Sequence, residues 1–204
     1  MKPVLLFDVD LTLFNTEKFK AAYPKSIASH FKISHDQFLI IGNEYRASLK
    51  KHTDYNISDY LKSISKRFNL PLHELKQICF SPENFACLYP DTLPTLSLLS
   101  SRYRLGIFSE GFKSFQTTKL KLAGIYHLFN PELIYIFRRK TTSASLAKLP
   151  HNSTIIDDNL KVIESLLASK IDPSHNFKPI WLNRKNHPVH PGVHTINSLA
   201  SLTT

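Results

Sequence analysis

The stretch Val4-Leu5-Leu6-Phe7-Asp8-Val9-Asp10-Leu11-Thr12-Leu13 decides the fold. Its first four residues are apolar, as in a strand of a parallel sheet that helices cover on both faces. Two aspartates, Asp8 and Asp10, follow directly, where open α/β sheets place their active sites. One carboxylate can attack an electrophile while its neighbour handles protons, and the pair can bind a hard cation.

Five further apolar runs predict strands of the same kind, because most of them do not alternate with polar residues. The runs are Leu105–Phe108, Leu133–Phe137, Thr154–Ile156, Pro179–Leu182 and Val193–Ile196. The segments between these runs carry apolar residues at helical spacing, as in Leu160, Ile163 and Leu167. A second helix pattern, Phe115-Lys119-Leu122, leads to Gly124, which suits a left-handed helix end. The alternation predicts a doubly wound α/β sheet with a Rossmann-like core.

The long stretch 15–89 has no convincing strand and reads as a helical insertion into a core of residues 1–14 and 90–204. Ser34-His35-Asp36-Gln37 fits a capping box, which predicts a helix through about Lys50. Ile57, Leu61, Ile64 and Phe68 have helical spacing, and Pro71 suits the first turn of the next helix.

Composition excludes several classes of protein. The 204 residues, 42% hydrophobic and 21% charged, suit one domain with an insertion. Cys79 and Cys87 are too few for a disulfide framework, so a reducing, cytoplasmic setting is expected. The apolar start is too short for a signal peptide, and no run approaches the ~18 apolar residues of a membrane span.

The formal net charge of +10 favours anionic partners such as phosphates, nucleic acid or membrane surfaces. The basic residues form only short clusters, so plain solubility is the ordinary explanation and nucleic-acid binding the alternative.

Polar residues also follow three other predicted strands. Ser109-Glu110-Gly111 opens a helix pattern, where a hydroxyl and free N–H groups suit an anionic oxygen, although a plain serine N-cap looks the same. Lys140 could neutralise phosphate and carboxylates, although Arg138 and Arg139 beside it leave simple solvation open. The adjacent carboxylates Asp157-Asp158 call for a counterion such as a divalent metal, unless they lie in a solvated loop.

In this order, the residues resemble the motifs of the haloacid dehalogenase-like (HAD) hydrolase superfamily. Asp8-x-Asp10-x-Thr12 is similar to its first motif, Ser109 to its second, Lys140 to its third and Asp157-Asp158 to its fourth. The resemblance covers nearly the whole chain, with residues 15–89 in the place of a helical (C1-type) cap.

The sequence departs from the family pattern at two places. Leu11 stands where glycine is common, and Val162 stands where many members carry a second acid of the fourth motif. The adjacent pair Asp157-Asp158 is itself a known variant, and which of the two ligates the metal directly stays open.

The resemblance implies a Mg²⁺-dependent phosphatase for a small phosphorylated metabolite, such as a sugar phosphate, phosphoglycolate or nucleotide. Asp8 would carry the phosphoryl group as an aspartyl-phosphate. Asp10 would act as acid and then as base, with a pKa that neighbouring like charges should raise. Lys140 would stabilise the transition state.

The same resemblance supplies the binding residues. Ser109, the following amides at Glu110 and Gly111, and Thr12 would contact the substrate. Mg²⁺ would bind Asp8, the backbone carbonyl of Asp10, and Asp158 or Asp157.

Other readings stay open. Dehalogenases of the family typically lack the second aspartate, so Asp10 favours phosphate chemistry. A phosphatase for nucleic-acid ends and a non-catalytic phosphate- or partner-binding protein are the alternatives, although the complete motif set speaks against the latter.

The histidines at 187, 190 and 194 could bind a transition metal, but a solvated loop explains them more simply. Lys18 and Lys20 could face an anionic substrate or solvent.

Overall fold

The computed structural model describes residues 2–50, 54–169 and 175–203. At its centre lies a six-stranded parallel sheet with the strand order β3-β2-β1-β4-β5-β6. The strands are β1 (Val4–Phe7), β2 (Arg104–Glu110), β3 (Ile134–Phe137), β4 (Thr154–Asp157), β5 (Lys178–Leu182) and β6 (Thr195–Ile196). Each overlaps one of the six predicted runs, so the predicted doubly wound α/β sheet is confirmed.

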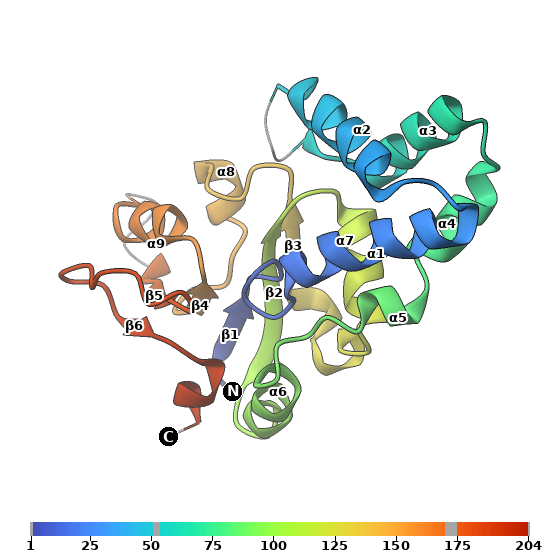
Figure 1. Ribbon diagram of the computed structural model, residues 1–204. Coiled ribbons are helices and arrows are strands. Elements are labelled where there is room, and N and C mark those ends of the chain that lie inside the picture. Colours follow the sequence, from blue (N-terminus) through green and yellow to red (C-terminus); the bar gives the residue numbers. More distant parts are fainter. Residues whose placement is uncertain (1, 51–53, 170–174, 204) are drawn as a thin grey trace.

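Helices cover both faces of the sheet (Figure 1). They are α6 (Thr92–Ser100) and α7 (Lys113–Leu122) on one face, and α8 (Ser143–Leu146) and α9 (Leu160–Leu167) on the other. In β1, Leu5 packs in the cluster that contains Leu96 of α6, whereas Leu6 packs in the cluster that contains Val162 of α9. Successive residues of a strand point to opposite faces, so a sheet covered twice requires an apolar residue at every position.

The buried side of α9 differs from the predicted one. Val162, Ile163 and Leu166 are buried, whereas Leu167 is 53% exposed. The predicted face through Leu160, Ile163 and Leu167 is therefore confirmed at Ile163 and wrong at Leu167. Five of the eight residues of this helix are apolar, so two neighbouring stripes fit helical spacing, and packing against the sheet selects one of them.

Helix ends follow the sequence more closely. Gly124, just beyond α7, has φ 78°, the predicted left-handed conformation. Helix α2 (His35–Ala47) begins after Ser34 as predicted but ends before Lys50, and the Ser34 side chain makes no capping hydrogen bond. Pro71 directly precedes α4 (Leu72–Cys79).

Five helices form an insert between β1 and β2. They are α1 (Thr16–Phe31), α2, α3 (Ile57–Phe68), α4 and α5 (Pro82–Phe85). Within 15–89, the described residues contain no strand, and Leu88 forms only an isolated bridge to Phe14. Figure 1 shows the insert to one side of the sheet, next to α7.

Aromatic rings join the insert to the core. The ring centroids of Phe19 in α1 and Phe85 in α5 lie 4.8 Å apart, and Phe19 lies 6.2 Å from Phe115 of α7. The insert and this face of the sheet therefore share one apolar cluster. Cys79 and Cys87 are buried free thiols whose pKa values are raised by burial, as expected of core residues of the insert.

Several side chains that the sequence singled out lie in ordinary surroundings. The Lys18 ammonium donates to the carbonyl of Ala86, and Lys20 pairs with the exposed Glu17. His187 stacks against the buried Trp181, and no group of three metal-ligating side chains among the described residues includes a histidine. In the part of the chain that the structure describes, no helix is long and apolar enough to cross a membrane.

Candidate active site

Four neighbouring strands, β3, β2, β1 and β4, bring the predicted residues to the carboxyl edge of the sheet. Asp8 follows β1, Ser109 lies near the end of β2, Lys140 follows β3, and Asp157 ends β4. These strands are parallel neighbours, so their carboxyl ends lie side by side. All four side chains are buried. A sheet edge that buries this many polar groups is the natural place for a catalytic site.

Lys140 is the central cation of this edge. Its Nζ lies 2.7 Å from Asp8 Oδ1 and 2.5 Å from Asp157 Oδ2, and its backbone amide donates to Glu110 Oε2. Burial alone would lower the pKa of Lys140, but the carboxylates of Asp157 and Asp8 raise it above its usual value. Lys140 is therefore a buried ammonium held between two carboxylates.

The two arginines beside Lys140 have a different partner. Arg138 and Arg139 each donate to Asp54 Oδ1 at 2.9 Å. Because Asp54 precedes α3, this pair of contacts links the insert to the end of β3.

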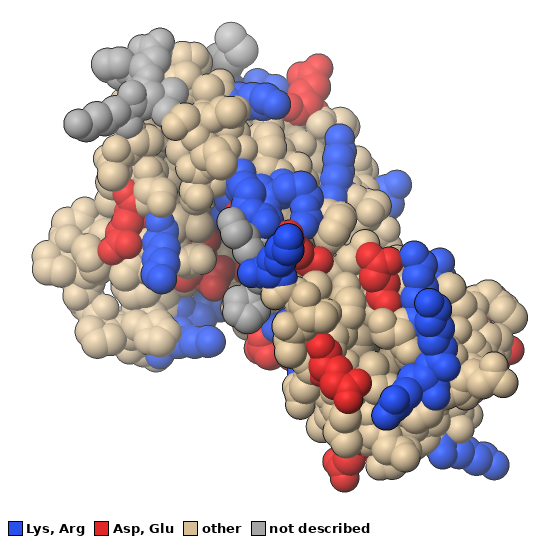
Figure 2. Space-filling view, turned by 90° about the horizontal axis from the view of Figure 1, so that it is seen from above, with Lys and Arg blue, Asp and Glu red and all other residues tan. Residues whose placement is uncertain are grey.

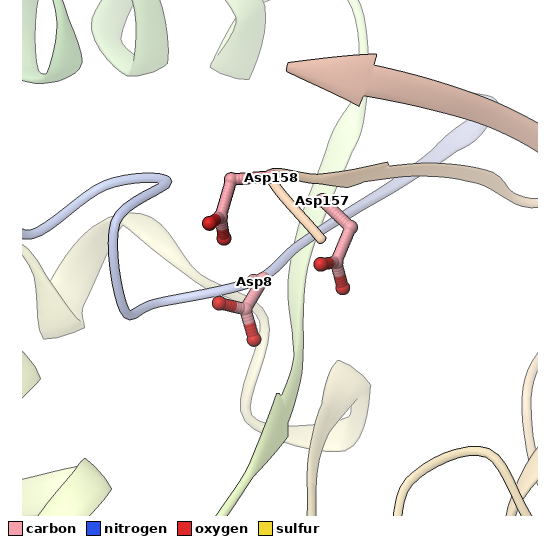
Figure 3. A group of neighbouring side chains, drawn as sticks. All are labelled: Asp8, Asp157 and Asp158. Atoms are coloured by element: carbon pink, nitrogen blue, oxygen red, sulfur yellow. The ribbon is translucent and has the colours of Figure 1, made fainter. Parts of the chain in front are cut away.

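Three carboxylates converge at this edge of the sheet (Figure 3). Asp8, Asp157 and Asp158 each offer an oxygen, and these oxygens all lie within 4.8 Å of one another. Oxygens bound to one octahedral Mg²⁺ at about 2.1 Å would lie roughly 3 to 4 Å apart. Hard anionic oxygens at this spacing fit a divalent cation.

The charges of this group suit a cation ligand site. Burial is the largest cause that raises the pKa of Asp8, and the nearby carboxylates of Asp157 and Asp158 add to it, against the opposing effect of Lys140. Burial and Asp157 likewise raise the pKa of Asp158. One lysine thus compensates the three carboxylates incompletely.

Asp158 is tied to the loop after β1. Its Oδ1 accepts a hydrogen bond from Thr12 Oγ1 at 3.3 Å, and its amide donates back to the same hydroxyl at 3.2 Å. Trp181 Nε1 donates to the Asp158 carbonyl at 2.9 Å. Thr12, predicted to contact substrate, therefore contacts Asp158.

Ser109 lies within β2 rather than at the start of a helix, so the predicted helix start is wrong. The residue that precedes α7 is Phe112. The Gly111 amide donates to the Phe137 carbonyl at 2.8 Å, and Gly111 has φ 139°, a conformation that favours glycine. The buried Ser109 Oγ has no hydrogen-bond partner among the described residues.

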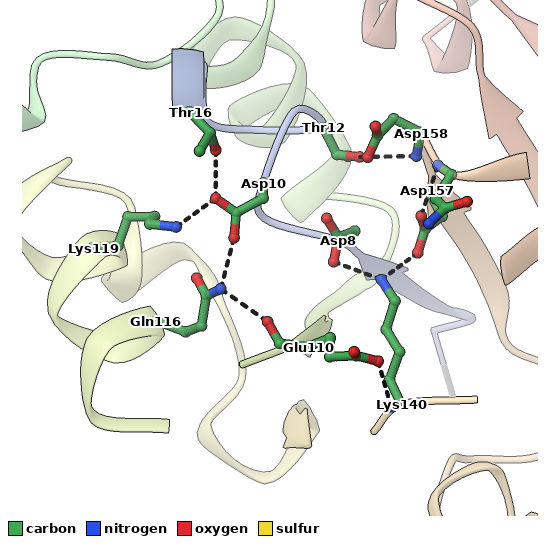
Figure 4. A network of polar contacts seen from close by, with 11 residues as sticks. Asp8, Asp10, Thr12, Thr16, Glu110, Gln116, Lys119, Lys140, Asp157 and Asp158 are labelled. Carbon is green, nitrogen blue, oxygen red and sulfur yellow. Dashed lines mark hydrogen bonds and ion pairs between the residues drawn. The ribbon is translucent and has the colours of Figure 1, made fainter. Parts of the chain in front are cut away.

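Asp10 is held apart from the other carboxylates (Figure 4). Its Oδ1 accepts from Lys119 Nζ at 2.5 Å and from the Thr16 hydroxyl, and its Oδ2 accepts from Gln116 Nε2 at 2.6 Å. Burial would raise the pKa of Asp10, but the Lys119 ammonium and these hydrogen bonds outweigh it and lower the pKa. The expectation that like charges raise this pKa is therefore wrong.

The sequence did carry a signal for this network. Lys119 occupies an apolar helix face between Phe115 and Leu122, and a lysine at such a position needs a buried counter-charge. Gln116 and Thr16 carry no comparable signal, because a single glutamine or threonine near a helix start is ordinary.

Comparisons with known proteins identify relatives of this chain. A family profile described as haloacid dehalogenase-like hydrolase matches residues 5–139. A curated protein of Methanothermobacter thermautotrophicus named glyceraldehyde 3-phosphate phosphatase is 29% identical over 138 residues. That match covers 64% of this chain and 61% of the relative's length.

Solved structures extend the likeness to the whole fold. A HAD phosphatase from Thermococcus onnurineus is 25% identical with a TM-score of 0.65, over 99% of this chain and 96% of that one. A haloacid dehalogenase-like protein of Burkholderia xenovorans LB400 has 18% identity and a TM-score of 0.69, over 99% and 95%. A 2-haloacid dehalogenase from Pseudomonas syringae pv. tomato DC3000 has 16% identity and a TM-score of 0.59, over 99% and 96%.

The last two likenesses show the fold alone, and relatives with this fold are named for two different reactions. The profile match spans well over half of the chain and includes the strands that carry Asp8 and Ser109. The chain therefore belongs to the haloacid dehalogenase-like hydrolases.

Proposed function

We propose that this hydrolase is a Mg²⁺-dependent phosphatase that cleaves a small phosphomonoester through an aspartyl-phosphate on Asp8. The observation that carries the proposal is the buried Lys140 ammonium, 2.7 Å from Asp8. On the neighbouring strand, Ser109 has a buried hydroxyl without a partner among the described residues. A cation and a free hydroxyl beside a carboxylate nucleophile can bind the oxygens of a phosphoryl group.

The chemistry would run in two halves. In the first, an oxygen of Asp8 bonds to phosphorus, the bond to the leaving oxygen breaks, and Asp10 protonates that oxygen. In the second, a water oxygen bonds to phosphorus and gives its proton to Asp10, the bond between phosphorus and Asp8 breaks, and inorganic phosphate leaves. The hydrogen bonds donated to Asp10 favour its carboxylate form, the form required for the second half.

The metal would be held by Asp8, Asp158 and the backbone carbonyl of Asp10. When bound, Mg²⁺ neutralises charge on the phosphoryl oxygens. Asp157 would hold Lys140 and add negative charge to the site, since its Oδ2 accepts from Lys140 and its Oδ1 accepts from the Asn159 amide.

Three predicted substrate contacts take other roles in this proposal. Thr12 orients Asp158 through their paired hydrogen bonds, and Glu110 fixes the backbone of Lys140. Gly111 gives its amide to the Phe137 carbonyl, so its contribution is the sharp turn after β2. Ser109 remains the proposed hydroxyl for phosphate.

The insert is proposed to act as a cap that covers the site and selects the substrate. Thr16, at the start of α1, touches Asp10, and Asp54 binds Arg138 and Arg139 at the end of β3. The insert thus contacts the site edge at two separate places. Closing such an edge would exclude water from the phosphoryl transfer.

The test is a hydrolysis panel with Mg²⁺ and with a chelator. It contains p-nitrophenyl phosphate, glyceraldehyde 3-phosphate, sugar phosphates and nucleoside monophosphates, with 2-chloropropionate to detect dehalogenation. Phosphate release that needs Mg²⁺ and is lost in Asp8→Asn is the expected result. Asp36→Asn is the matched control, because Asp36 is exposed in the insert. Chloride release without phosphate release would overturn the proposal.

A nucleic-acid substrate is the second candidate, and surface charge favours it. Seen from above, Lys and Arg side chains gather in the middle of the face, and another row runs over the insert (Figure 2). Turnover of oligonucleotide end phosphates that falls steeply with added salt would support this substrate class. Preference for small esters, with little dependence on salt, would exclude it.

A further inference from the structure

We infer that Lys119 is a positioning residue that holds the Asp10 carboxylate for proton transfer and keeps it out of the metal-binding group. This role rests on the proposed phosphatase function. Lys119 lies on α7, outside the four family motifs, and its effect would be exerted entirely through Asp10 (Figure 4).

The surroundings of Lys119 leave its ammonium one acidic partner among the described residues. Its side chain is only 2% exposed, and Nζ lies 5.2 Å from the ring centroid of Phe14 and 4.9 Å from that of Phe115. The acidic partner is Asp10, 2.5 Å away. A buried ammonium without a counter-charge is very costly, so Lys119 has to stay paired with Asp10. The two aromatic rings hold the ammonium in the place where it makes this pair.

Both carboxylate oxygens of Asp10 accept hydrogen bonds from α7. Lys119 binds Oδ1, while Gln116 binds Oδ2 and also donates to the Glu110 carbonyl. Asp10 is consequently absent from the group of converging carboxylates, although it lies only two residues from Asp8. The geometry assigns the two aspartates to different tasks, and α7 provides the separation.

This division has a kinetic signature. Protonation of the leaving oxygen matters for an alkyl phosphate, whose alkoxide is a poor leaving group, and hardly matters for p-nitrophenyl phosphate, whose anion is stable. The ratio kcat/KM reports steps up to loss of the leaving group, so the second half of the reaction does not affect it. A misplaced Asp10 should therefore lower kcat/KM selectively for the alkyl ester.

The experiment compares Lys119→Met with the wild type on glycerol phosphate and p-nitrophenyl phosphate. We expect kcat/KM to fall about 10- to 100-fold on the alkyl ester and less than about threefold on the aryl ester. Lys121→Met is the matched control on the same helix, since Lys121 is exposed and lies near Tyr126 rather than Asp10. An equal loss on both esters, or no loss, would overturn the role.

A double-mutant cycle removes the remaining ambiguity. In an Asp10→Asn background, Lys119→Met should have no further effect on the alkyl ester, whereas a merely structural lysine would cost the same in both backgrounds. If circular dichroism shows that Lys119→Met does not fold, Lys119→Leu, which also fills the apolar site without an N–H donor, takes its place in both comparisons.

The two proposals fail in different ways. A wild type that cleaves neither ester, with no effect of Asp8→Asn, would end the phosphatase proposal and the role of Lys119 with it. A wild type that cleaves both, with an unchanged alkyl-to-aryl ratio in the lysine variants, would end only the latter.

Discussion

Leu11 stands in a backbone conformation that side chains seldom adopt. Its φ is 61°, in the left-handed region, and its amide donates to the Phe14 carbonyl at 2.8 Å. Left-handed geometry costs an L-residue about 1 kcal/mol or more. The tight loop that carries Asp10 and Thr12 therefore keeps a strained residue at the place where the family commonly has glycine.

This strain predicts an unusual order of stability. Leu11→Ala and Leu11→Gly both lose the side-chain contacts beyond Cβ, but only glycine accepts the positive φ freely, so the glycine variant should be more stable by about 1 kcal/mol. Urea unfolding of both variants measures the difference. Leu98, which is exposed in α6, is the control, because alanine should exceed glycine there. Alanine ahead of glycine at both positions would rule out strain at Leu11.

The motif residues of the site could be predicted from sequence, but their electrostatics could not. Asp8 and Asp10 both follow a buried strand, and nothing local distinguishes their pKa values. The difference arises because Asp10 meets Lys119, which lies 109 residues away in the chain, whereas Asp8 is buried among other carboxylates. A contact of that separation follows from the topology, which a local pattern does not specify.

Among the elements, β2 depends on one glycine. A Cβ added at Gly106 would lie 2.5 Å from the Leu133 carbonyl oxygen and 2.7 Å from Leu6 Cδ2. Both neighbours belong to buried structure, so neither can move freely. Gly106→Ala should lower the free energy of unfolding by about 1 to 3 kcal/mol, as overpacking does.

Urea unfolding measures this loss, and Gly192→Ala is a control for backbone strain alone. Gly192 has φ 77° and nothing within 4 Å of an added Cβ, so its loss should be about 1 kcal/mol. A smaller loss at Gly106 than at Gly192 would contradict the close approach at β2.

The strands were the easiest elements to predict, because covering both faces of the sheet makes most of their positions apolar and so produces continuous apolar runs. Helices were harder where tertiary contacts decide between similar options. Ser109 extends β2 because Ser109 and Glu110 pair with Ile136 and Phe137 of β3, and that pairing overrides the capping preference of serine. The buried stripe of α9 was likewise chosen by the sheet beneath it.

At the scale of the whole molecule, Asp91 ties distant parts of the chain together. It lies at the return from the insert and accepts hydrogen bonds from Arg184 beyond β5, and from the Ser198 hydroxyl and the Leu199 amide near the end of the sheet. Arg184 also donates to the Thr12 carbonyl at 2.9 Å. Asp91 thereby supports, from outside the site, the loop that carries Asp10 and Thr12.

Asp91→Asn should lower the free energy of unfolding by about 2 kcal/mol at neutral pH, because charged hydrogen bonds are lost. Burial would raise the pKa of Asp91, but Arg184, Ser198 and Leu199 lower it below 3.8. A lowered folded-state pKa means that this stabilisation is complete above the unfolded value and is lost as the pH falls below it.

The difference in the free energy of unfolding between the wild type and Asp91→Asn should therefore be largest at about pH 7. It should shrink towards roughly pH 3, since asparagine does not titrate. Urea unfolding at several pH values measures this difference, and Glu44→Gln, at an exposed position within α2, should show none at any pH. A difference that stays constant down to the acid limit would mean that Asp91 stabilises the fold through its shape and neutral hydrogen bonds. Its charge would then have no part in holding Arg184 against the Thr12 loop.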